Sequence, residues 1–246
     1  MLLEIDPKKK KVSSMKRIFI FLIDALSAFI LFLSLFLTVG NLTIKEIEKD
    51  NISNMNIIFK EICDNENLPY SNNNQYNLYE LDYETYMDKL INEGNTSDKA
   101  YELYLESENK LNEKLSLNTD YVNYYNSFYI TYKLASIISM FISLFLLQFL
   151  IPLLSKKNST LSMKLFKTTI VNSKDSVIIS KNQILLRFFI IFITEYICVF
   201  LLVEWIGLIF VILTSFFSIS ISKRKATIHD LVMKTQLNYI EYSYTE

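Results

Sequence analysis

Several ionisable side chains lie inside long apolar runs, where a charge needs a partner or a function. Asp24 is the only ionisable residue within residues 18–39, while Arg187 and Glu195 interrupt the apolar run of residues 184–222. A carboxylate at membrane depth is costly and faces protein, water or a partner. Two interpretations follow from these residue types. Protonated acids or an ion pair with Arg could join helices, or the acids could form a proton or cation site.

A second group whose residue types could carry out chemistry is the adjacent pair His229 and Asp230, a few residues beyond the last apolar run. Such a pair suggests a general base or a metal ligand. The chain has one His, and Cys63 and Cys198 fall in different environments, so we expect neither a zinc site nor a disulfide. A helix cap or a salt bridge is the commoner role. Because no catalytic motif occurs, we expect no enzyme activity, no cofactor or metal and no nucleic-acid partner.

The elements that must position these residues are membrane helices. We expect the first span at residues 16–40, because its 22-residue apolar core extends about 33 Å, and the second at residues 127–154. The run at 184–222 would be about 58 Å long as one helix, so we predict a hairpin of two spans that turns near Glu204. Basic residues flank both ends of that run, which requires an even number of crossings. Three spans remain the alternative to four.

Charge is segregated along the chain, although the net charge is only −1. Residues 1–15 form a basic tail, and residues 155–183 form a cationic amphipathic segment with six Lys and one Asp. The insert at residues 41–126 carries 17 acidic and 7 basic side chains, and its periodicity predicts two amphipathic helices within residues 79–117. With residues 223–246 as a second tail, the pattern predicts an all-α polytopic helical bundle in the cell membrane. Both termini are expected to be cytoplasmic and the helical insert extracytoplasmic.

These features together resemble the RDD family of bacterial membrane proteins. Arg17 and Asp24 match its first two signature positions, and Asp230, within residues 223–235, matches the third. Residues 160–172 are similar to the family's amphipathic segment, and residues 184–188 to its Leu-Leu-Arg entry into the third span. The resemblance covers residues 16–40 and 127–238. Ser162 stands where the family usually has Gly, and Met233 where it usually has Ala.

The resemblance implies a membrane bundle, but it leaves the biochemical role open, because fold does not fix function. Our first hypothesis is an accessory or structural membrane protein whose insert engages a membrane or envelope protein. The alternative is a small transporter that works as an oligomer, such as the sodium/proton antiporter proposed for some family members. Asp24, Glu195 and Asp230 would then be the candidate pathway for sodium ions or protons.

The sequence also predicts a cytoplasmic clasp among charged residues at one end of the bundle. Arg17 precedes the first span and Asp230 follows the last, so we predict that Arg17 pairs with Asp230 across helices. Arg187 and His229 belong to the same candidate clasp. Asp24 is expected to lie deeper and to face the bundle. The partners expected for the whole protein are the lipid bilayer, an envelope or membrane protein and a second copy of the chain.

Overall fold

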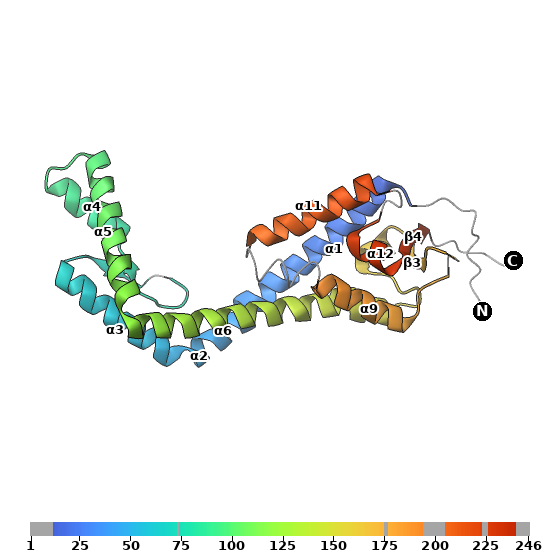
Figure 1. Ribbon diagram of the computed structural model, residues 1–246, viewed down its shortest axis with the longest axis horizontal. Helices are drawn as coiled ribbons and strands as arrows, with labels where there is room; N and C mark the ends of the chain where they lie inside the picture. The colour runs from blue at the N-terminus through green and yellow to red at the C-terminus, as the bar shows by residue number, and fades with distance from the viewer. Residues whose placement is uncertain (1–11, 73, 175–176, 194–204, 223–225, 240–246) are drawn as a thin grey trace. The chain divides into compact units, whose positions relative to one another are not determined.

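The computed structural model describes residues 12–72, 74–174, 177–193, 205–222 and 226–239. The described chain is mostly helical (Figure 1). It divides into two compact units: unit 1 comprises Met1–Leu35 and Ile137–Glu246, and unit 2 comprises Phe36–Ser136.

Two helical stretches in the described chain are long and apolar enough to cross a membrane, Ser14–Ile47 and Thr119–Leu154. Each is interrupted by a π-helical segment. The first consists of α1 (Ser14–Leu35), η1 (Phe36–Gly40) and α2 (Asn41–Ile47), and the second of α6 (Thr119–Leu144), η2 (Phe145–Leu150) and α7 (Ile151–Leu154). Gly40 and Pro152 are the first Gly or Pro in the two stretches, so strong helix breakers are absent from their apolar cores. The helices expected at 16–40 and 127–154 are confirmed.

The expected hairpin at residues 184–222 lies partly outside the described residues. Its first part is α9 (Lys181–Ile191), and its last part is α11 (Trp205–Ile221). Helix α9 begins with a capping box, because Ser180 Oγ accepts from the Gln183 N–H at 3.4 Å and Gln183 Oε1 accepts from the Ser180 N–H at 2.8 Å. This fixes the first turn of α9 and thereby the position of Arg187 on the next.

The all-α expectation is incomplete, because two small antiparallel sheets accompany the helices. In unit 1, β3 (Thr168–Asn172) pairs with β4 (Thr235–Tyr239) in the register Ile170 to Leu237. The amphipathic segment expected before the third span is therefore a short helix, α8 (Leu161–Leu165), followed by a strand. Residues 168–171 are all β-branched and all buried, which favours an extended backbone over a surface helix.

A compact core joins these segments to the membrane helices of unit 1. It brings together buried apolar side chains from α1, α8, β3, α9, β4 and the residues beside them: Val12, Ile20, Met163, Ile170, Ile179, Ile184 and Leu237. Figure 1 shows α12 (Ile228–Met233), β3 and β4 gathered close to one another. Helix α8 and strand β3 come from the segment 155–183, and α12 and β4 come from the C-terminal segment. These two segments, which are distant in the sequence, thus pack together in one layer.

Unit 2 contains the two amphipathic helices that the sequence predicts, α4 (Tyr83–Asn92) and α5 (Ser97–Leu117). Asp82 and Thr96 cap their N-termini by accepting from backbone N–H groups two to three residues into each helix. Helix α5 packs against α4 through Ala100 and against α3 (Lys49–Glu66) through a second core cluster around Cys63. A two-residue sheet, β1 (Tyr70–Ser71) with β2 (Glu80–Leu81), closes the connection between α3 and α4.

A buried carboxylate, that of Glu48, forms hydrogen bonds between helices of unit 2. Glu48 lies between α2 and α3, is 3% exposed, and accepts from Asn51 Nδ2 at 2.7 Å. The hydroxyls of Ser127 and Thr131 on α6 donate to its other oxygen at 3.3 and 2.5 Å. A buried carboxylate that accepts three bonds is satisfied, so Glu48 ties α6 to the junction of α2 and α3.

Candidate functional site

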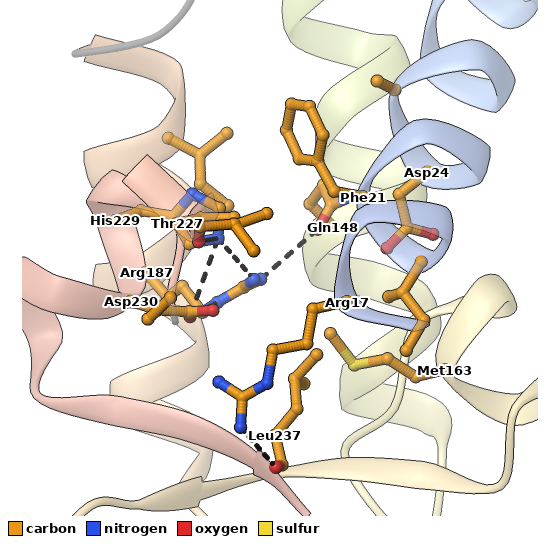
Figure 2. A pocket seen from close by; sticks show the side chains of 15 residues that line it. Arg17, Phe21, Asp24, Gln148, Met163, Arg187, Thr227, His229, Asp230 and Leu237 are labelled. Carbon is orange, nitrogen blue, oxygen red and sulfur yellow. Dashed lines mark hydrogen bonds and ion pairs between the residues drawn. The ribbon is translucent and has the colours of Figure 1, made fainter. Parts of the chain in front are cut away.

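The candidate site is a cavity of about 40 Å³ within unit 1, into which four elements bring polar side chains (Figure 2). Helix α1 contributes Arg17 and Asp24, and α9 contributes Arg187. The other two polar contributors are η2 and α12, with the residues just before α12. A cavity of this size has room for water, because a single water needs about 10–15 Å³.

Arg187 is the centre of the hydrogen-bond network in this cavity. Its Nε donates to Asp230 Oδ1 at 3.2 Å, and the two side chains are only 5% and 6% exposed. Its other two nitrogens reach Gln148 Oε1 at 3.3 Å and His229 Nε2 at 2.7 Å. Figure 2 shows the guanidinium between Gln148 on one side and His229 and Asp230 on the other. Arg187 is 4% exposed, so its guanidinium lies inside unit 1 and not at the surface.

The ring of His229 contacts three polar side chains through one nitrogen. Arg187 Nη2 lies 2.7 Å from Nε2 of His229. Thr227 Oγ1 lies 2.9 Å from the same nitrogen and Asp230 Oδ1 lies 3.6 Å from it. His229 Nε2 is therefore in contact with Arg187, Thr227 and Asp230 at once.

Asp230 is held as a carboxylate by its surroundings. Burial alone would raise the pKa of Asp230, but positive charge on His229 and Arg187, together with hydrogen bonds from Thr235 and Arg187, lowers that pKa below its ordinary value. Thr235 Oγ1 donates to Oδ1 at 2.9 Å, from the first residue of β4. Arg187 carries a charge at any pH of interest, so it is the permanent counter-ion. Asp230 thus links α9, α12 and β4.

Arg17 makes a different contact from the one that the sequence predicts. The guanidinium donates from Nε to the Val12 carbonyl at 3.0 Å and from Nη2 to the Leu237 carbonyl at 3.2 Å. Asp230 acts on Arg17 electrostatically, but the cation bonded to Asp230 is Arg187. Arg17 therefore ties the start of α1 to strand β4. Of the residues predicted for the clasp, Arg187, His229 and Asp230 contact one another, and Arg17 lines the same cavity.

Asp24 faces the same cavity and holds α8 in place. Its Oδ2 accepts from Thr160 Oγ1 at 2.7 Å, and its Oδ1 lies 3.4 Å from the Ser162 backbone nitrogen. Thr160 is in turn the N-cap of α8, since its Oγ1 accepts from the Met163 N–H at 3.3 Å. The carboxylate thus connects α1 to the first turn of α8.

The structure brings together most of the predicted site residues. Arg17, Asp24, Arg187, His229 and Asp230 all line the one cavity, whereas Glu195 and Glu204 lie outside the described residues. The sequence did not predict two kinds of polar side chain that bond to the site residues, namely a side-chain amide and two hydroxyls. Gln148 was identifiable as the only side-chain amide in the apolar run of residues 127–154. The hydroxyls of Thr160 and Thr235 gave no such signal, because their partners are distant in sequence.

A comparison with protein-family models decides which family the chain belongs to. The RDD family model matches residues 11–234, from before α1 to the end of α12. The chain belongs to the RDD family. The three signature positions, Arg17, Asp24 and Asp230, line the cavity just described. No curated protein and no solved structure matches the chain.

Proposed function

We propose that this RDD protein is a non-enzymatic accessory membrane protein, in which unit 1 is a closed membrane anchor and unit 2 engages a protein partner. The observation that carries the proposal is that the signature carboxylates are already engaged. Asp230 is bonded to Arg187 and Thr235, and Asp24 to Thr160 of the α8 cap. Their bonds join five elements of one unit, which is what an architectural role requires.

The proposed arrangement has four crossings with both termini in the cytoplasm. Two long apolar helices support it, together with the lysines that precede α9 and those that precede α8. Unit 2 then lies on the other side of the membrane. Single cysteines in a Cys63→Ser/Cys198→Ser background test this arrangement. A membrane-impermeant maleimide should label Ser97→Cys in intact cells and label Lys164→Cys only after lysis; the reverse pattern refutes it.

Unit 2 has the surface that a partner would need. Tyr101 and Leu105 are one turn apart on α5, are 49% and 38% exposed, and are surrounded by exposed acids. Paired apolar side chains within a charged rim are typical of protein contact sites. The segment of residues 40–126 carries ten more acids than bases, so a partner with a cationic contact surface fits best.

Site-specific photo-crosslinking in native membranes tests this function. A photoreactive residue at Tyr101 or Leu105 should give one discrete crosslinked product. The same residue at Lys60, an exposed position on α3, is the matched control and should give none. A product of twice the chain mass identifies the partner as a second copy. Absence of any product from the α5 positions, with the protein correctly inserted, contradicts the proposal.

Cation/proton exchange is retained as a second candidate for one reason. Asp24 and Asp230 line the same water-sized cavity, which is the arrangement a proton or sodium pathway would use. Purified protein in proteoliposomes decides between the two candidates. A sodium gradient that drives a pH change, lost in Asp24→Asn, supports exchange; no change with either protein leaves the accessory function.

A further inference from the structure

In the part of unit 1 that the structure describes, the exposed charge has one sign. Among the described residues of this unit, every exposed charged side chain is a lysine, and the two acids Asp24 and Asp230 face the cavity. The lysines come from segments at the ends of the helices: Lys16, Lys156, Lys164, Lys167, Lys174, Lys181 and Lys234. They include residues at the start of α1, on α8, on either side of β3 and between α12 and β4. Figure 1 shows α12, β3 and β4 close together. The described surface at this end is therefore cationic.

Within this cationic end, α8 presents two apolar side chains outward. Leu161 and Leu165 are 45% and 70% exposed, and Lys164 is exposed between them. At about 100° per residue these three positions fall within one arc of about 100°, while Ser162 and Met163 lie on the remaining arc. Those last two are 1% and 2% exposed. One turn of helix thus has a buried face and an amphipathic outer face.

The orientation of α8 is fixed from inside the unit. Asp24 accepts from Thr160, the N-cap, and Met163 packs into the core beside Ile20 of α1. Lys167, with φ of 53°, then reverses the chain into β3. Because both ends of the turn are anchored, Leu161 and Leu165 cannot fold inward. Nothing in the described part of the chain covers them fully.

We propose that α8 and its neighbouring lysines dock on the surface of a bilayer that contains anionic phospholipid. Charge complementarity supports this occupant, since lysines near an anionic leaflet attract it. The position of α8 directly after a membrane helix supports this occupant as well. That helix ends at Leu154, which is 76% exposed and lies only six residues before Thr160. Five residues of helix extend about 7.5 Å, so α8 lies along the interface and does not enter the bilayer. Leu161 and Leu165 insert between headgroups while the lysine ammonium groups contact lipid phosphates.

An environment-sensitive fluorophore on α8 tests the proposal in the full-length protein. The label is attached at Leu165→Cys in a Cys198→Ser background, because Cys63 is buried. Nanodiscs of phosphatidylcholine with increasing phosphatidylglycerol should shift its emission to the blue. Lys164→Gln/Lys167→Gln should raise the phosphatidylglycerol fraction required, because each lost charge weakens binding about fivefold. Lys60→Gln/Lys99→Gln, two exposed lysines of unit 2, is the charge-matched control and should leave the titration unchanged.

Three outcomes would overturn the inference. Emission that is the same in phosphatidylcholine and phosphatidylglycerol shows that α8 does not recognise anionic lipid. The same blue shift from inorganic phosphate in phosphatidylcholine nanodiscs shows a site for a free anion. An unchanged titration in the Lys164→Gln/Lys167→Gln protein assigns the lipid preference to another surface. None of these results bears on the proposed partner of unit 2, so the two proposals fail independently.

Discussion

The ion pair between Arg187 and Asp230 should be the most costly single interaction to break in unit 1. Both side chains are almost fully buried, at 5% and 6% exposure. Removing one partner leaves an uncompensated buried charge, which costs about 3–5 kcal/mol, whereas apolar replacement of both partners removes that penalty. The double variant still leaves Gln148 and Thr235 without a partner, at about 1 kcal/mol each.

A double-mutant cycle measures this coupling. We expect Arg187→Met and Asp230→Leu each to lower the free energy of unfolding strongly. The double variant should lose at least about 3 kcal/mol less than the sum of the single losses. The assay is denaturant unfolding of the purified protein in detergent micelles, followed by circular dichroism.

The control for this cycle is an exposed ion pair in unit 2. Lys110 lies 3.1 Å from Glu66, with side chains 61% and 27% exposed, so Lys110→Met should cause no measurable loss. Additive single losses, within about 0.5 kcal/mol, would refute the reasoning that the buried pair organises unit 1.

Three further predictions concern the titration of Asp230, the hydrogen bonds of Glu48 and the buried thiol of Cys63. Because the folded-state pKa of Asp230 is depressed, its stabilisation is full above about pH 4 and is lost as the pH falls below that value. The difference in unfolding free energy between wild type and Asp230→Asn should therefore narrow at acid pH; a constant difference contradicts this. Glu48→Ala strands three donors and should cost about 2–4 kcal/mol in thermal or denaturant unfolding, and Glu48→Gln should cost less. Cys63 is 0% exposed, and burial raises the pKa of its thiol to about 11, so in a Cys198→Ser background mass spectrometry should detect alkylation only after unfolding.

The sequence was sufficient where a property depends on neighbouring residues. Apolar length gave the two long helices, because a helix of about 20 apolar residues satisfies its own backbone. Helical periodicity within residues 79–117 gave α4 and α5. The resemblance to the RDD family grouped Arg17, Asp24 and Asp230, and these three residues line one cavity.

The sequence was insufficient where a property depends on which distant segments meet. The sheet of β3 and β4 was missed because its strands are more than 60 residues apart and neither alternates in burial. The partner of Asp230 was misassigned for the same reason. Arg17 and Arg187 each lie near the start of an apolar run, and only packing decides which guanidinium bonds to the carboxylate.

Sequence by itself therefore determined the family, the apolar helices and the residues that would be costly to bury alone. The cost of burying a charge is a property of the residue type, so it can be read before the fold is known. Tertiary structure decided how that cost is met. Asp230 is neutralised by Arg187, Arg17 bonds to backbone carbonyls, and Asp24 bonds to the cap of α8, because those partners come from segments that only folding brings together.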